Sequence, residues 1–239
     1  MLVLIVEAFG RALVLTERGF DVFPMGHPLM EDYGGDYAFE QSLAKRETRL
    51  GDRAEPLTVA LLPGSRRQEL KHLLPVLKVT TMAILGHMSD RPVRFVVSIA
   101  PGVDPALINE VFDTGIELSR APLPQLLESA DLALVCSGTA SLETSLAGVP
   151  HALAYRTGSL NYAIARRLVR VPYIGLPNLI VDRAMVPEHV QDDADPTHLS
   201  NSLLGFLNTP GRRETFYRDC SDLRRRCGGA GVWRRAAHA

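Results

Sequence analysis

The stretch that decides the fold is Leu57-Thr58-Val59-Ala60-Leu61-Leu62-Pro63-Gly64-Ser65-Arg66, which joins an apolar run to a glycine turn. A short, continuous apolar run is typical of a strand that is buried on both faces of a parallel sheet. The residues from Gln68 to His87 favour a helix after the turn. A buried strand, a tight turn and a helix make up the first half of a βαβ unit.

Strand and helix patterns alternate along the chain after this unit. We expect further strands at 93–99, 116–118, 132–136 and 151–155, and further helices at 105–113, 123–129 and 140–147. Strands that alternate with helices predict a parallel sheet with right-handed crossovers. The predicted fold class is therefore α/β, with a Rossmann-like parallel sheet.

The chain divides into four parts. Residues 1–30 predict a βαβ unit, with strands at 2–6 and 20–25 around a helix. Residues 31–56 are polar and charged, and predict a linker that contains a short helix. Residues 57–195 form the main α/β domain, and residues 196–239 form C-terminal helices. The arginine-rich end of the last part, from 224 to 235, is typical of a solvated or frayed terminus.

Composition excludes several classes of protein. Of the 239 residues, 46% are hydrophobic and 22% charged, and 26 basic against 27 acidic residues leave a net charge of −1. This is a globular composition, and it lacks the sustained basic field that non-specific nucleic-acid binding requires. No apolar run approaches the roughly 20 residues of a membrane-spanning helix. The cysteines, Cys136, Cys220 and Cys227, have no zinc-type spacing and predict reduced thiols in a cytoplasm-like compartment.

Two glycine turns each follow a predicted buried strand and precede a predicted helix. In the first turn, Gly64 lets the backbone approach an anion, and Arg66, next to Ser65, offers a fork of donors to phosphate. The second turn is Ser137-Gly138-Thr139. Free N–H groups and the helix dipole attract anions at such turns. Helix capping alone explains each turn equally well.

Glu143 lies four residues beyond Thr139, one turn along the same predicted helix face. A carboxylate placed there can accept hydrogen bonds from a ribose diol, or can simply be favoured near the positive end of the helix. Ligands of open parallel sheets bind at the carboxyl ends of the strands, where both turns belong. The two turns together therefore predict a site for a nucleotide phosphate.

The sequence also resembles the lipid-A-disaccharide synthase family, in motifs that run in consistent order from about residue 2 to residue 210. These motifs are Gly26-His27-Pro28-Leu29, Leu61 to Glu69, Ser137 to Glu143, Ala154-Tyr155-Arg156, Ala165 to Val169, Pro172 to Leu179 and Gln191-Asp192-Asp193-Ala194. The resemblance implies the C-terminal half of a GT-B glycosyltransferase fold, together with a remnant of the N-terminal, acceptor-binding domain.

The resemblance also implies an activity. Members of the family transfer 2,3-diacylglucosamine from UDP-2,3-diacylglucosamine to 2,3-diacylglucosamine 1-phosphate (lipid X), giving lipid A disaccharide 1-phosphate and UDP, without a metal or other cofactor. Arg66 would be the catalytic residue, because it would offset the charge that grows on the diphosphate as UDP leaves. The implied donor-binding residues are Gly64, Ser65, Arg66, Ser137, Gly138, Thr139, Glu143, Asn178 and Gln191.

Three further arginines have an implied role at a lipid surface. Arg156, Arg166 and Arg167 would face acyl chains or anionic headgroups, which places the protein in the cytoplasm at the inner membrane of a Gram-negative-type cell. The alternative is that the helix predicted at 160–170 packs on the sheet with its arginines in water.

The family has a complete acceptor-binding domain before the segment that matches Gly26-His27-Pro28, and that domain supplies its catalytic base. Only about 25 residues precede this segment here, and His27 is interpreted as a turn residue rather than a replacement base. Three interpretations stay open. The chain is a donor-binding half that is inactive alone, or one subunit of a split enzyme or homodimer, or a nucleotide-sugar-binding module without catalysis.

Overall fold

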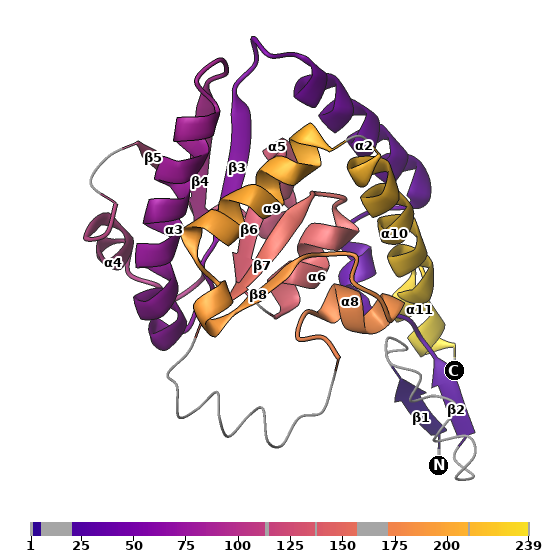
Figure 1. Cartoon of the computed structure of the whole chain (residues 1–239). Helices are drawn as coiled ribbons and strands as arrows, with labels where there is room; N and C mark the ends of the chain where they lie inside the picture. Colours follow the sequence, from indigo (N-terminus) through magenta and orange to yellow (C-terminus); the bar gives the residue numbers. More distant parts are fainter. Residues whose placement is uncertain are drawn as a thin grey trace.

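The computed structural model describes residues 2–5, 21–112, 115–136, 138–156, 172–209 and 211–238. In these ranges the main sheet has six parallel strands in the order β5-β4-β3-β6-β7-β8 (Figure 1). The strands are β3 (Leu57–Leu62), β4 (Val93–Ser98), β5 (Ile116–Ser119), β6 (Leu132–Cys136), β7 (His151–Tyr155) and β8 (Glu188–Val190). This is the strand order of the Rossmann fold. The predicted α/β class is confirmed.

The order of the strands reverses between β3 and β6, the two central strands. Leu61 of β3 pairs with Val97 of β4 on one side and with Leu134 of β6 on the other. Both central strands are buried along their whole length, which explains their unbroken apolar sequences. Ligands of open α/β sheets bind outside the carboxyl ends of the strands at such a reversal.

Helices cover both faces of the sheet. Figure 1 shows α3 and α9 packed together on one face, and α5 and α6 on the other. The helices in this part of the chain are α3 (Arg67–His87), α4 (Ala106–Asn109), α5 (Leu123–Ser129), α6 (Thr139–Leu146), α8 (Leu176–Val181) and α9 (Pro196–Asn208), with the short 3-10 helix η2 (Gln191–Asp193) between β8 and α9. None of the helices in the described ranges combines the length and the apolar character that crossing a bilayer requires.

The segment 31–56 is more than the linker with a short helix that its polar sequence suggested. It contains α2 (Asp36–Gly51), which has sixteen residues. Arg46 in this helix is fully buried, and its guanidinium donates to the carbonyls of Ala130, Gly148 and Leu127 at 2.9, 3.0 and 3.1 Å. In the sequence, an arginine whose donors are all taken by buried carbonyls looks the same as an arginine on the surface. The length and the buried contacts of α2 were therefore not predicted.

The expectation of a solvated end from residue 224 is wrong for Arg224. This residue lies in α10 (Arg212–Arg226) and is only 2% exposed. Its guanidinium donates to the carbonyls of Leu146 and Gly34 at 2.9 and 2.6 Å and stacks on the ring of Phe39 at 4.5 Å. The last helix, α11 (Val232–Ala237), follows a glycine turn and places Arg235 Nε 3.0 Å from the carbonyl of Met25. Arg224 and Arg235 therefore join the C-terminal helices to the rest of the chain, whereas Arg225, Arg226 and Arg234 are exposed, as expected.

The N-terminal part forms a separate pair of parallel strands, β1 (Leu2–Ile5) and β2 (Asp21–Pro24), followed by the 3-10 helix η1 (Pro28–Glu31). The pair lies beside α11 at the edge of the molecule (Figure 1). The helix predicted between these strands and the helix predicted at 160–170 lie outside the described residues.

Candidate functional site

A cavity of about 860 Å³ lies at the carboxyl ends of β3, β4, β5 and β6, where the strand order reverses. Most of its walls come from the residues that directly follow these strands. They are Gly64, Ser65 and Arg66 after β3, Ser98 at the end of β4 and Ile99 to Pro101 after it, Arg120 to Leu123 after β5, and Gly138, Thr139 and Ala140 after β6, with Glu69 and Glu143 from the helices. The cavity therefore occupies the position at which Rossmann-like sheets bind their ligands.

The first turn at this cavity requires glycine. Gly64 has a φ of +94°, which L side chains rarely adopt, and a Cβ there would lie 2.6 Å from Glu69 Oε2 and 3.4 Å from Cys136 Sγ. The chain then enters α3, whose N-cap is Arg66. The Arg66 side chain is 82% exposed, and its Nη1 lies 3.1 Å from Glu69 Oε1. Because an exposed ion pair is weak, this guanidinium is free to turn toward an anion in the cavity.

The second turn also depends on a glycine. Gly138 has φ +123° and ψ −156°, a backbone conformation restricted almost entirely to glycine, and it caps the start of α6. The Oγ of Ser141 donates to the Gly138 carbonyl at 2.7 Å and fixes the first turn of the helix. The first N–H groups of a helix have no partner within it, so this end of α6 offers donors to the cavity. Ser137 lies outside the described residues.

Glu143 lies one turn into α6 on the cavity wall and is held by a tyrosine from the segment before α2. The hydroxyl of Tyr33 donates to Glu143 Oε2 at 2.7 Å. Burial and the negative charge of Asp32 raise the pKa of Glu143, against the lowering effect of the hydrogen bond from Tyr33. Burial and the Glu143 carboxylate likewise raise the pKa of Tyr33. The pair is therefore a phenol donating to a carboxylate that is costly to ionise.

Tyr33 was not among the residues predicted from the sequence, and no local pattern marks it. It meets Glu143 across 110 positions of sequence, so only the tertiary fold brings the pair together. Arg120 was also missed: it directly follows β5 at the same edge of the sheet, but this strand is not buried and no glycine turn follows it. Arg120 and Arg66 are the arginines that line the cavity within the described part of the chain.

Two predicted donor-binding residues do not line this cavity. Asn178 in α8 is fully buried, and its side-chain amide donates to the carbonyl of Val186 and to Glu188 Oε1, each at 2.8 Å, while its oxygen accepts from the Val186 N–H at 2.9 Å. These hydrogen bonds let Asn178 fix the chain at Val186 and Glu188, where the last strand of the sheet begins. Gln191 begins η2 with a φ of +56°. Direct contact of either residue with a donor stays a prediction.

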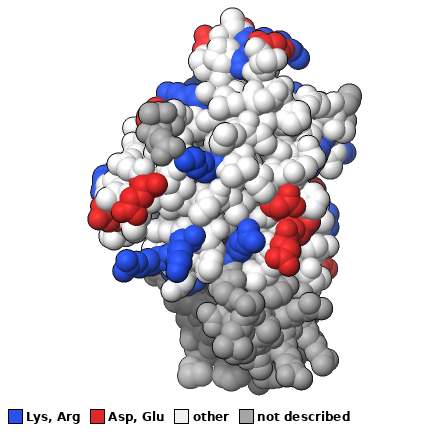
Figure 2. Space-filling view, turned by 60° about the vertical axis from the view of Figure 1, so that its left-hand side comes forward, with Lys and Arg blue, Asp and Glu red and all other residues white. Residues whose placement is uncertain are grey.

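The arginines predicted to face lipid are only partly described. Arg156 directly follows β7 and is half-buried, and it does not line the cavity. Arg166 and Arg167 lie outside the described residues. Over the face seen in Figure 2, the basic and acidic side chains form small, separate groups within an uncharged surface.

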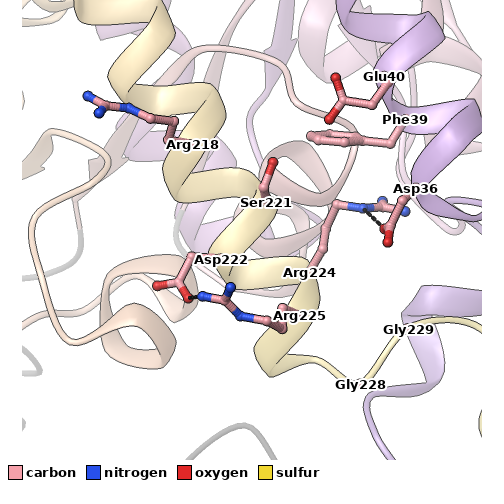
Figure 3. A pocket seen from close by; sticks show the side chains of 10 residues that line it. All are labelled: Asp36, Phe39, Glu40, Arg218, Ser221, Asp222, Arg224, Arg225, Gly228 and Gly229. Carbon is pink, nitrogen blue, oxygen red and sulfur yellow. Dashed lines mark hydrogen bonds and ion pairs between the residues drawn. The ribbon is translucent and has the colours of Figure 1, made fainter.

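A second cavity, of about 650 Å³, lies between α2 and α10. Figure 3 shows two ion pairs among its charged side chains: Arg224 points toward Asp36, and Arg225 toward Asp222. Its lining includes three acidic and three basic side chains, which leave no net positive charge to attract an anionic ligand.

Comparison with known proteins decides the family. The profile of the lipid-A-disaccharide synthetase family matches residues 13–227. The chain belongs to this family. It is 33% identical over 225 residues to a lipid-A-disaccharide synthase of Syntrophus aciditrophicus, and the match covers 92% of this chain and 57% of the relative. A lipid-A-disaccharide synthase of Pseudomonas aeruginosa is 35% identical over 211 residues, and the match covers 84% of this chain and 53% of the relative. The chain thus spans about half the length of these relatives.

Solved structures of lower sequence identity share the fold. The wall teichoic acid polymerase TagF superposes with a TM-score of 0.53 at 10% identity, and the match covers 91% of this chain and 51% of TagF. A putative UDP-N-acetylglucosamine 2-epimerase from Listeria monocytogenes superposes with a TM-score of 0.53 at 15% identity, and the match covers 86% of this chain and 50% of the epimerase. Each match takes up about half of the solved chain. The expected fold, a Rossmann-like half of a GT-B glycosyltransferase, is confirmed.

Proposed function

We propose that this chain supplies the donor-binding half of a lipid A glycosyltransferase. The donor is UDP-2,3-diacylglucosamine, the acceptor is 2,3-diacylglucosamine 1-phosphate, and the products are lipid A disaccharide 1-phosphate and UDP. The observation that carries the proposal is the cavity at the strand reversal, which has a helix N-terminus and a glycine turn on two of its sides. Membership of the lipid-A-disaccharide synthase family supplies the substrates.

In the proposed complex the diphosphate of UDP lies between the starts of α3 and α6. The N–H groups of both helix ends point their partial positive charge at it, and the exposed Arg66 turns from Glu69 to donate to phosphate oxygens. When the acceptor hydroxyl attacks the donor sugar, the bond from the sugar to the diphosphate breaks and negative charge grows on UDP. Arg66 would stabilise that charge. That no metal or other cofactor takes part is implied by the family resemblance.

Glu143 would recognise the ribose of the donor. Its Oε2 already accepts from Tyr33, which leaves Oε1 for a ribose hydroxyl. Because the Tyr33 hydroxyl fixes the carboxylate, this acceptor is ordered before the nucleotide arrives, and less entropy is lost on binding. Tyr33 is thus a positioning residue of the proposed donor site.

The remaining parts of the proposal concern the acceptor and the membrane. The catalytic base would come from an acceptor-binding domain, as in the family. Arg156, Arg166 and Arg167 would lie against the cytoplasmic surface of the inner membrane, where both acylated substrates reside. Guanidinium groups next to anionic lipid headgroups gain from the negative surface potential, which supports this orientation.

A transfer assay tests the proposal. The chain is mixed with UDP-2,3-diacylglucosamine and lipid X, with and without the separately produced N-terminal half of the Pseudomonas aeruginosa relative, and the disaccharide 1-phosphate is followed by chromatography. We expect product only when the N-terminal half is added, and much less product with Arg66→Ala than with Arg67→Ala in the same mixture. Product formation that is equal for the two variants would contradict the role given to Arg66.

A further inference from the structure

Two imidazoles and a carboxylate meet on the turn that joins β8 to α9, outside the donor cavity. His189 lies in β8, Asp193 ends η2, and His198 lies in the first turn of α9. The Nδ1 atoms of His189 and His198 each lie 2.8 Å from the Asp193 carboxylate, on Oδ2 and Oδ1 respectively. Their rings are stacked, with centroids 6.0 Å apart and planes 18° apart. The three potential ligand atoms all lie within 4.8 Å of one another.

The ring of His189 is held in this orientation from its far side. Its Nε2 lies 2.8 Å from the hydroxyl of Ser202 in α9, and only 12% of the side chain is exposed. Metal-binding histidines usually have their second ring nitrogen fixed by such a partner, which sets the tautomer and aims the other nitrogen. Ser202 therefore leaves Nδ1 of His189 directed at the point where the cluster converges.

His198 is also placed before any ligand arrives, because Asp195 caps α9. The Asp195 Oδ1 accepts from the N–H groups of Thr197 and His198 at 2.8 and 3.1 Å, and its Oδ2 lies 2.6 Å from His198 Nδ1. The cap fixes the backbone of His198 and keeps its ring beside Asp193. Both histidines are thus ordered by contacts that a ligand at the cluster would not have to create.

We propose that His189, Asp193 and His198 form a binding site for a divalent transition metal of the zinc type. Two imidazole nitrogens and one carboxylate oxygen are a ligand set that Zn²⁺ accepts, with a water molecule in the fourth position. Mg²⁺ and Ca²⁺ prefer oxygen ligands throughout, so a cluster with two nitrogens disfavours them. The ion would join the edge strand β8 and η2 to α9. None of the three residues lines the donor cavity, although Gln191, a predicted donor-binding residue, begins the same η2 that Asp193 ends.

The geometry requires little movement. Two ligands about 2.1 Å from a tetrahedral ion lie about 3.4 Å apart. The two contacts of 2.8 Å between Asp193 and the histidines would therefore open by about 0.6 Å, and any pair of ligand atoms near the 4.8 Å limit would close by about 1.4 Å. The Asp193 carboxylate exchanges its contacts with the two Nδ1 atoms for a bond to the ion. Both imidazoles bind in the neutral form, and any proton on Nδ1 is released to solvent or moves to Nε2.

The test is metal binding by the 239-residue chain, freed of any histidine tag and treated with chelator. Zn²⁺ is titrated by calorimetry, and Co²⁺ is added as a spectroscopic probe whose visible absorption reports tetrahedral nitrogen and oxygen ligands. We expect one Zn²⁺ per chain and an intense Co²⁺ spectrum. His189→Gln, Asp193→Asn and His198→Asn should each weaken Zn²⁺ binding by about tenfold or more.

His87→Gln is the matched control, because this histidine is exposed on α3 and bonds only to the carbonyl of Ala83 among the described residues. It should keep the stoichiometry and the Co²⁺ spectrum of the unaltered chain. His198→Asn changes an exposed helix-start residue, so the test survives if His189→Gln does not fold. Absence of Zn²⁺ binding, or binding that survives in both His189→Gln and His198→Asn, would overturn the proposal and leave a carboxylate hydrogen-bonded between two histidines.

Discussion

Replacing Glu143 by glutamine separates ribose recognition from diphosphate recognition. The substitution keeps the size of the side chain and an oxygen that can accept from Tyr33, and it removes the negative charge. In the proposed complex Oε2 is occupied by Tyr33, so the ribose gains a single hydrogen bond from this residue. Pyrophosphate has no ribose, so its binding should not depend on Glu143.

The size of the effect follows from that single bond. A hydrogen bond to a charged group contributes about 1.5 to 3 kcal/mol, which corresponds to about 10- to 150-fold in affinity. Because glutamine keeps a neutral acceptor, we expect UDP binding to weaken by about tenfold, the lower end of this range. The affinity for pyrophosphate should stay unchanged, and Glu110→Gln, at an exposed glutamate after α4, should change neither.

The same variant should be more stable than the unaltered chain at neutral pH. The pKa of Glu143 is raised in the folded chain, chiefly by burial, so this carboxyl favours folding fully below its ordinary pKa of 4.5 and loses that contribution as pH rises through the folded value. Glutamine has no such loss. We therefore expect a higher Tm for Glu143→Gln at pH 7.5, and a difference that narrows as pH falls toward 4.5.

Calorimetric titrations with UDP and pyrophosphate, and thermal unfolding followed by circular dichroism across this pH range, measure both effects. Equal losses of affinity for the two ligands would show that Glu143 acts on the diphosphate or on the fold. A lower Tm of the variant at pH 7.5 would refute the assignment of Glu143 as an acid that is costly to ionise.

Two further substitutions test the contacts around the site. Tyr33→Phe should weaken UDP binding by about fivefold, because one hydrogen bond of about 1 kcal/mol that orders Glu143 is lost. The control is Tyr37→Phe, on the exposed side of α2, which should leave the affinity for UDP unchanged. Identical affinities for the two variants would contradict the positioning role of Tyr33. Arg46→Met should lower the free energy of unfolding, measured in urea, by about 3 kcal/mol or more, because buried carbonyls lose their donor. The control is Lys45→Met, at the exposed neighbouring position. A similar small loss of stability in both variants would show that Arg46 does not anchor α2.

Much of the main sheet was predictable because its strands are buried on both faces. The expected strands 132–136 and 151–155 and the helix 123–129 match β6, β7 and α5 in their bounds. Such segments have continuous apolar sequences, and glycine or proline marks many of their ends. The short edge strand β8 was not expected, since its three residues, Glu188 to Val190, include two polar side chains and are only partly buried.

The candidate site was predictable where one turn holds its chemistry, and not where tertiary contacts do. Gly64, Arg66, Gly138 and Glu143 line one cavity because parallel strands bring their carboxyl ends to one edge. Tyr33 does not line the cavity itself, but it donates to Glu143 from a segment with no local signature. In the same way, Arg224 looked like a solvated charge in sequence and is buried against Phe39 in the fold.

The measurement that tests the central claim most directly is a calorimetric titration of the folded chain with UDP, repeated with Arg66→Ala and Arg67→Ala. Both arginines are exposed neighbours at the start of α3, but only Arg66 lines the cavity between the glycine turns. We predict one UDP per chain, about 10- to 150-fold weaker binding in Arg66→Ala from the loss of charge-assisted hydrogen bonds, and unchanged binding in Arg67→Ala. A folded chain that does not bind UDP, or equal losses in the two variants, would contradict the claim that this cavity holds the donor diphosphate.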